Sequence, residues 1–162
     1  ELARAKALTE EVRLELGARP VEIGIMIEVP SAVMMAAELA AEVDFFSVGS
    51  NDLTQYTLAV DRMHPVLSRQ ADGLHPAVLR MIERTVRAAD KAGKWVGVCG
   101  GIAGDPLGVV LLTGLGVREL SVSIPSIAAV KAQIRGLSME RARALAQRAL
   151  ACSGATQVRR LR

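Results

Sequence analysis

The sequence predicts an α/β fold in which parallel strands alternate with helices. Four short apolar stretches are separated by longer stretches whose apolar residues recur at helical spacing. Consecutive strand–helix units of this kind form a parallel sheet, with the helices as crossovers. The chain has 162 residues, enough for one domain with a hydrophobic core. A complete (β/α)8 barrel needs roughly 250 residues, so we expect only a part of one.

The first unit begins with a helix and a buried strand. Residues 1–16 place apolar side chains on one helical stripe and charged side chains on the other side. Residues 21–27 are rich in β-branched side chains and alternate little, as in a strand buried on both faces. Glu28 follows this strand, where a carboxylate is paired, hydrated or bound to a metal ion. A second helix is predicted over residues 30–41.

The second unit carries most of the candidate ligand-binding residues. A strand over residues 44–48 is followed by Asn51 and Asp52 in a loop, and then by a helix over residues 53–60. Three groups suit an anionic ligand: the free N–H groups at the helix start, the side-chain amide of Asn51 and the planar guanidinium of Arg62. Asp52 can hold a hard metal ion through its carboxylate oxygens. A helix cap at Asn51 and a dipole partner at Asp52 explain the pattern equally well.

The third unit ends in a cysteine followed by two glycines. After a long loop, an amphipathic helix over residues 75–91 precedes a strand over residues 95–98. Cys99 closes this strand and is either an inert buried residue or a functional thiol at a strand end. Gly100 and Gly101 are small enough to let a ligand approach the backbone.

A fourth strand and three more helices complete the domain. The predicted elements are a helix from Asp105 to about Gly114, a strand over residues 119–122, a helix over residues 126–134 and a helix after Ser138. We assign residues 1–150 to the domain and residues 151–162 to a polar C-terminal tail, expected to be frayed from Cys152 onward.

Composition excludes several classes of function. The net charge is only +3, and one tryptophan, one tyrosine and two phenylalanines are too few for stacking on nucleic acid. No run of about 18 apolar residues could span a membrane, and the N-terminus does not read as a signal peptide. Two distant cysteines suggest neither a disulfide framework nor a zinc site. These features predict a cytoplasmic protein.

Three long motifs stand in a fixed order along the chain. They are GIMIEVP at residues 24–30, DFFSVGSNDLTQYTLAVDR at residues 44–62 and WVGVCGGIAGD at residues 95–105. In these motifs the chain resembles the PEP-binding domain of enzyme I of the bacterial phosphotransferase system, the phosphoenolpyruvate–protein phosphotransferase. ADGLHPAVLR at residues 71–80 and the CGG at Cys99 are more similar to multiphosphoryl transfer proteins of fructose-type systems.

The resemblance implies a fold and a set of residue roles. The units would form the C-terminal half of a PEP/pyruvate-binding TIM barrel, whose first half carries two phosphate-gripping arginines that are not in this sequence. Glu28 and Asp52 would hold Mg2+, while Asn51 and Arg62 would fix the phosphoryl group. Cys99 would be the general acid that protonates the enolate of pyruvate, a task for which a thiol carries its proton at neutral pH.

The resemblance also implies partners. The phosphoryl group would pass to a histidine on a separate domain of the same protein and then to a downstream phosphocarrier, for sugar uptake. Without the first half of the barrel we expect the isolated chain to be inactive, and to form a homodimer that covers its open edge. One departure concerns Gly101, because enzyme I commonly has glutamate there.

Two alternatives stay open. Pyruvate phosphate dikinase and PEP synthase share this domain and much of its site. A non-catalytic module for dimerisation or regulation is a third possibility, for which the departure at Gly101 leaves room.

Overall fold

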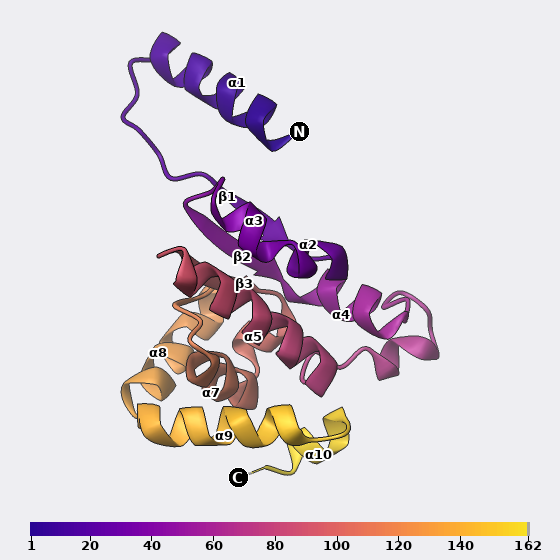
Figure 1. Ribbon diagram of the computed structural model, residues 1–162. Coiled ribbons are helices and arrows are strands. Elements are labelled where there is room, and N and C mark those ends of the chain that lie inside the picture. Colours follow the sequence, from indigo (N-terminus) through magenta and orange to yellow (C-terminus); the bar gives the residue numbers. More distant parts are fainter. Residues whose placement is uncertain (162) are drawn as a thin grey trace.

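The sheet has four parallel strands that follow one another in sequence order (Figure 1). The structure is a computed structural model and describes residues 1–161. The strands are β1 (Gly24–Ile27), β2 (Phe45–Gly49), β3 (Trp95–Cys99) and β4 (Glu119–Leu120). Helices cross over between each pair of neighbours, so the predicted α/β fold of parallel (β/α) units is confirmed. Within residues 1–161 the sheet is open, with β1 and β4 as its outer strands.

The part of the chain that the structure describes also has ten α-helices and two 3-10 helices. They are α1 (Leu2–Glu15), α2 (Pro30–Met34), α3 (Ala36–Ala40), α4 (Ser50–Leu58), η1 (Leu67–Gln70), α5 (Pro76–Lys91), α6 (Gly101–Gly104), α7 (Pro106–Leu115), η2 (Ile124–Ser126), α8 (Ile127–Arg135), α9 (Met139–Ala151) and α10 (Ala155–Arg159). None of the helices in residues 1–161 is long and apolar enough to cross a membrane.

One face of the sheet is buried beneath helices. Phe46 and Val48 of β2 point into this layer and are fully enclosed. α5 packs against β2 and β3 with a buried stripe of apolar residues: Val78, Leu79, Ile82, Val86 and Ala89. Its start follows from its sequence, because Pro76 fits the first helical turn and the His75 side chain accepts a hydrogen bond from the Ala77 N–H at 3.2 Å.

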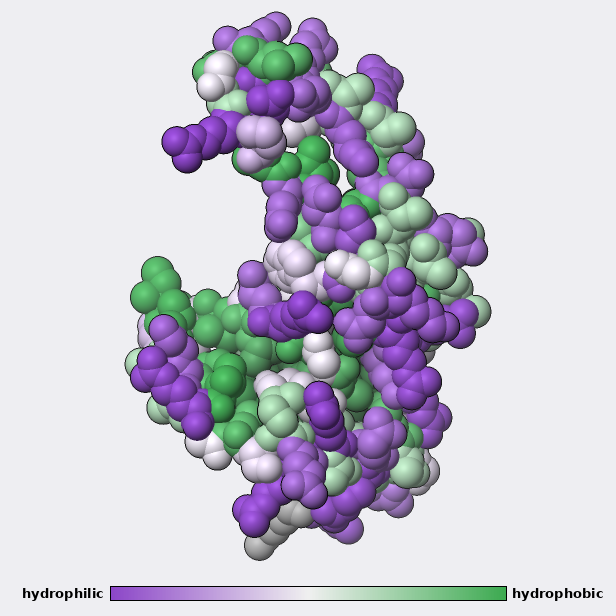
Figure 2. Space-filling view, turned by 60° about the vertical axis from the view of Figure 1, so that its left-hand side comes forward, coloured by the Kyte–Doolittle hydropathy of each residue, from purple (hydrophilic) through white to green (hydrophobic). Residues whose placement is uncertain are grey.

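The opposite face of the sheet is open, which corrects the expectation of strands buried on both sides. Met26 of β1 points to this face and is 46% exposed, and Glu119 of β4 is also exposed. Phe45 and Trp95 stack here with ring centroids 4.4 Å apart. Figure 2 shows a deep hollow in the surface with a hydrophobic lip. No element in residues 1–161 covers this face, and for that reason the strands are enclosed on one side only.

Two helix boundaries differ from the prediction. α4 begins at Ser50, so Asn51 and Asp52 lie in its first turn and not in a loop. The cause is a tertiary contact, because the Ser50 hydroxyl donates a hydrogen bond to the carbonyl of Cys99 on the neighbouring strand. The helix predicted over residues 30–41 is split into α2 and α3 at Met35, whose backbone is not helical.

Residues 155–161 are part of the folded domain. Val158 of α10 is fully buried in the hydrophobic core, and Leu161 packs against the same core. The expectation that the chain is frayed from Cys152 onward is therefore wrong for residues 155–161, which are folded against the core. By contrast, α1 buries none of its residues and stands apart from the sheet (Figure 1), although Lys6 Nζ donates to the Glu42 carbonyl at 2.7 Å.

Candidate functional site

The ends of β1, β2 and β3 meet at one side of the sheet, which we call the carboxyl edge. Gly49 and Cys99 are register partners at the last position of their strands. Glu28 follows β1, and its carboxylate lies so near Gly49 that a Cβ there would be only 2.8 Å from Oε2. The Cys99 thiol is 3.6 Å from the Val48 carbonyl oxygen. The carboxyl edge therefore brings together a carboxylate, a helix start and a thiol.

Asn51 is held in a defined orientation at this edge. Its Oδ1 accepts a hydrogen bond from the Gly101 N–H at 2.9 Å. Because the backbone N–H can only donate, the amide oxygen must face Gly101 and the amide nitrogen must face away. Nδ2 has no hydrogen-bond partner among residues 1–161. Asn51 can therefore donate two hydrogen bonds to a ligand.

Asp52 and Arg62 form an ion pair beside Asn51. The distance from Arg62 Nη1 to Asp52 Oδ2 is 3.0 Å, and both side chains are partly exposed. The backbone N–H of Arg62 also donates to Gln55 Oε1 at 3.2 Å, which holds the start of the following loop against α4. A pair with this much exposure stabilises the fold little and can rearrange when a ligand binds.

The residues at the carboxyl edge fit Mg2+ held together with a substrate. Within residues 1–161 no three side chains of His, Cys, Asp or Glu gather as a complete metal site. Glu28 is half-buried and has no hydrogen bond or ion pair among the described residues. Mg2+ is commonly bound by one or two protein carboxylates plus water and substrate phosphate. Glu28 and Asp52 satisfy that requirement, but they are too few to hold the ion alone.

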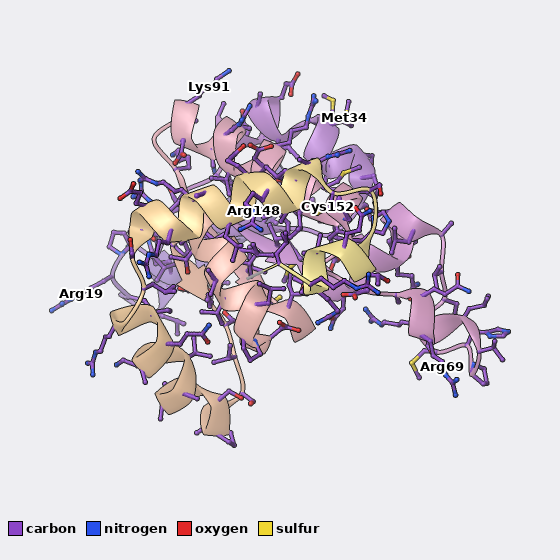
Figure 3. All side chains as sticks on the ribbon, turned by 90° about the horizontal axis from the view of Figure 1, so that it is seen from below. Arg19, Met34, Arg69, Lys91, Arg148 and Cys152 are labelled. Atoms are coloured by element: carbon purple, nitrogen blue, oxygen red, sulfur yellow. The ribbon has the colours of Figure 1, made fainter. Side chains whose placement is uncertain are left out.

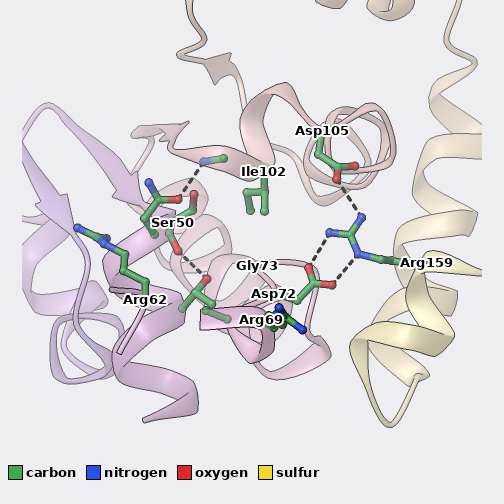
Figure 4. Close-up of a pocket in the computed structure, with 12 residues that line it drawn as sticks. Ser50, Arg62, Arg69, Asp72, Gly73, Ile102, Asp105 and Arg159 are labelled. Atoms are coloured by element: carbon green, nitrogen blue, oxygen red, sulfur yellow. Dashed lines mark hydrogen bonds and ion pairs between the residues drawn. The ribbon is translucent and has the colours of Figure 1, made fainter. Parts of the chain in front are cut away.

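A pocket of about 390 Å3 lies next to this edge (Figure 4). Of the predicted site residues, Asn51 and Arg62 line it, while Glu28, Asp52 and Cys99 are outside its lining. Its other charged lining residues are Arg69, Asp72, Asp105 and Arg159. Figure 3 shows Arg69 on the loop that projects from the body of the molecule. The pocket therefore has an excess of arginine, which suits an anionic ligand.

Arg159 makes three hydrogen bonds across the pocket wall. Its Nε and Nη2 donate to Oδ2 and Oδ1 of Asp72 at 2.6 and 2.8 Å, and its Nη1 donates to Asp105 Oδ2 at 3.0 Å. We call this group the Arg159 clamp. Hydrogen bonds to Asp72 and Asp105 raise the pKa of the guanidinium, so its positive charge is permanent.

The pKa of Asp72 is shifted in the opposite direction, below its ordinary value. Burial raises the pKa of this carboxyl, but hydrogen bonds from Arg159 and from the Leu74 N–H, with the charges of Arg159 and His75, outweigh it. The net pKa is lowered, so Asp72 is ionised near neutral pH. Sequence reasoning missed the clamp, because Arg159 stands in a run of arginines that resembles a solvated tail. The one available signal was Asp105 before Pro106, which marks a helix cap.

Comparison with known proteins identifies the domain. Residues 1–139 match the PEP-binding domain of PEP-utilising enzymes. All 162 residues align with the multiphosphoryl transfer protein of Rhodobacter capsulatus at 69% identity, covering 20% of that protein. The multiphosphoryl transfer protein of Xanthomonas campestris is 54% identical over 99% of this chain and 19% of its own.

A third relative is the phosphoenolpyruvate-protein phosphotransferase of Geobacillus stearothermophilus, which is 42% identical over 98% of this chain and 28% of its own. The chain thus spans about a fifth of the length of the first two relatives and somewhat more of the third. The predicted resemblance to enzyme I and to multiphosphoryl transfer proteins is confirmed. The chain belongs to the family of PEP-binding domains of PEP-utilising enzymes.

Proposed function

We propose that this chain is the PEP-binding part of a phosphoenolpyruvate–protein phosphotransferase. The whole protein would transfer the phosphoryl group of PEP to a histidine on a separate domain and release pyruvate. The observation that carries the proposal is that Glu28 and Cys99 lie beside Gly49, directly before the helix whose first turn carries Asp52, in a chain of this family. The relatives named above are phosphotransferases, which favours this function over a dikinase.

Glu28 and Asp52 would hold Mg2+ at the carboxyl edge. The bound cation would offset the negative charge of the phosphate and carboxylate groups of PEP. Glu28 has no other partner among the described residues, which supports its role as a ligand. Asp52 would exchange part of its ion pair with Arg62 for the cation.

Asn51 and Arg62 would bind the phosphoryl group. The free Nδ2 of Asn51 donates to a phosphoryl oxygen, and the Arg62 guanidinium offers a planar pair of donors. The start of α4 adds backbone N–H groups, because its N-cap Gly49 has no side chain to satisfy them. These groups hold the phosphoryl group in place, and positioning and charge account for most of the catalysis of phosphoryl transfer.

Cys99 would complete the reaction as the general acid. When the bond between phosphorus and the bridging oxygen breaks, its electron pair remains on the departing enolate. The thiol proton passes to the methylene carbon of that enolate, giving pyruvate and a thiolate that takes a new proton from water. The half-buried thiol at the end of β3 is consistent with delivery of the proton from one face only.

The remaining partners belong to the same proposal. They are a phospho-histidine domain of the same protein, a downstream phosphocarrier protein and a second copy of the chain in a homodimer. The cytoplasmic location predicted from the sequence also belongs here. We do not adopt the alternative of a non-catalytic module, because no observation favours it over the catalytic proposal.

Replacement of the two cysteines in the full-length parent protein tests the proposal. Cys99→Ala should lower the rate of pyruvate release from PEP by about two to three orders of magnitude, because a general acid is lost. Cys152→Ala is the matched control and should keep the wild-type rate, because this cysteine follows the end of α9, donates to the Arg148 carbonyl at 3.4 Å and does not line the pocket. The measurement is steady-state pyruvate release in the presence of Mg2+ and the acceptor domain.

A second measurement follows the stereochemistry of proton delivery. PEP labelled with deuterium and tritium at its methylene carbon should give chiral pyruvate with the wild-type protein and racemic pyruvate with Cys99→Ala. Equal rates and equal chirality for the two cysteine variants would show that Cys99 does not protonate the enolate.

Asp52→Ala should raise the Mg2+ concentration needed for half-maximal activity. An unchanged Mg2+ requirement would show that Asp52 is not a ligand of the metal ion.

A further inference from the structure

We propose that Arg159 is a positioning residue for PEP, which fixes the pocket wall and offsets one of the two negative charges of the aspartates that line it. The inference rests on the proposed function. Arg159 lies on α10, far along the chain from the carboxyl edge, yet it lines the same pocket as Asn51 and Arg62 (Figure 4). No motif that carries the family resemblance includes it.

The clamp joins two segments whose aspartates also accept hydrogen bonds from their own local backbone. Asp72 Oδ1 also accepts from the Leu74 N–H at 3.0 Å, so Arg159 fixes the end of the loop before α5. Asp105 Oδ1 accepts from the Leu107 and Gly108 N–H groups and caps α7. One guanidinium thus holds a loop end and a helix start in a single arrangement.

Tight packing links the clamped loop to Asn51. Gly73 lies so close to Ile102 of α6 that a Cβ at this glycine would overlap the isoleucine side chain. Gly101, the neighbour of Ile102, donates the hydrogen bond that orients Asn51. A shift of the loop at Asp72 would therefore press on α6 and disturb Asn51 through contacts already described.

Charge gives the clamp a second effect. Asp72 and Asp105 line a pocket whose proposed ligand carries several negative charges. With Arg159 present, the three groups sum to one negative charge, and without it to two. All three groups line one pocket of about 390 Å3, and salt does not fully screen charges within roughly 8 Å, the Debye length of physiological salt, so the added charge would weaken binding of an anion.

The helix that carries Arg159 is anchored firmly enough for this role. Val158, its neighbour, is fully buried in the core. At the start of α10, the Ser153 N–H and hydroxyl both donate to Gln157 Oε1 at 2.9 and 3.0 Å. The backbone that leads into Arg159 is therefore fixed, and its side chain transmits that rigidity to the pocket wall.

Arg159→Gln and Arg159→Lys in the full-length parent test the inference. Arg159→Gln should raise the KM for PEP about tenfold while kcat stays within about twofold, because positioning and charge are lost but the reacting groups remain. Arg159→Lys keeps the charge but not the planar fork, so its KM should be intermediate. Arg160→Gln is the matched control, because this exposed neighbour has no side-chain partner among the described residues.

Identical KM values for Arg159→Gln and Arg160→Gln, or a fall in kcat with unchanged KM, would overturn the inference. If Arg159→Gln does not fold, as judged by circular dichroism, the KM of Arg159→Lys decides alone. If the wild-type parent does not convert PEP, the proposed function fails, and the positioning role is then judged by hydrogen exchange. Amides of residues 71–74 should exchange at least about tenfold faster in Arg159→Lys than in wild type, and equal rates would refute the role.

Discussion

Gly100 sets the turn that joins the thiol to the phosphate-binding residues. Its φ of 94° and ψ of −174° lie in a region that side chains other than hydrogen rarely permit. The space where a Cβ would stand is filled by Ser50 and Asn51. Those two residues bond to the backbone on either side of this glycine, at Cys99 and Gly101. A single backbone conformation therefore holds β3 and α4 together.

Gly100→Ala should lower the free energy of unfolding by about 2–3 kcal/mol, because it adds both backbone strain and a clash. Gly104→Ala is the matched control, at the end of the short helix α6 that Gly100 precedes. Its Cβ would meet only Val122, at 3.9 Å, and its φ is not positive, so stability should be unchanged or slightly higher. Urea denaturation of the two variants gives the comparison, and equal losses in both would show that this turn is not strained by a side chain.

Whether a site residue could be predicted depends on how far along the chain its contact partners lie. Glu28, Asp52 and Cys99 follow strands, and parallel strands end at the same edge, so strand prediction alone brings these residues together. Arg159 and Asp72 are 87 positions apart, and no periodicity connects them. Their contact depends on the packing of α10, which a polar stretch of sequence does not reveal.

At the scale of elements, the order of strands and long helices could be predicted, but the short helices could not. α5 and α9 have apolar stripes and capping residues within their own sequence. α4 starts at Ser50 because of a bond to β3, and α10 exists because Val158 enters the core. Such boundaries are set by contacts from elsewhere in the chain, so local patterns place them incorrectly.

The ion pair between α10 and the loop before α5 predicts a dependence of stability on pH. The pKa of Asp72 is lower in the folded chain than in the unfolded chain, so the unfolded state binds the proton more readily below neutral pH. The stabilisation is present above the unfolded value of about 4 and is lost as the pH falls through the lower folded value. Arg159 stays charged throughout this range.

Asp72→Asn should therefore be less stable than wild type by about 1 kcal/mol near pH 7, and the difference should shrink toward pH 3. Asp90→Asn is the control, because Asp90 is exposed and lies 4.0 Å from Arg118, too far for a strong pair. Urea denaturation across this pH range measures both differences. A constant difference for Asp72→Asn at every pH would mean that its charge does not contribute.

At the scale of the whole molecule, one face of the sheet is covered by helices and the other face is exposed. Parallel sheets are normally covered on both sides, yet residues 1–161 cover only the side beneath α5. The other side presents Met26 and the stacked rings of Phe45 and Trp95. A surface of this kind is expected to bind further protein, either the first half of a barrel or a second copy of the chain.

The 162-residue chain alone should therefore self-associate through its open face and release no pyruvate from PEP. Met26→Lys places a charge on that face and should weaken association about tenfold. Met34→Lys is the matched control, because Met34 is 55% exposed on the outer helix layer (Figure 3) and should leave association unchanged. Sedimentation velocity over a range of concentrations distinguishes the variants. A chain that remains monomeric, or one that Met34→Lys dissociates and Met26→Lys does not, would show that the open face is not the surface that associates.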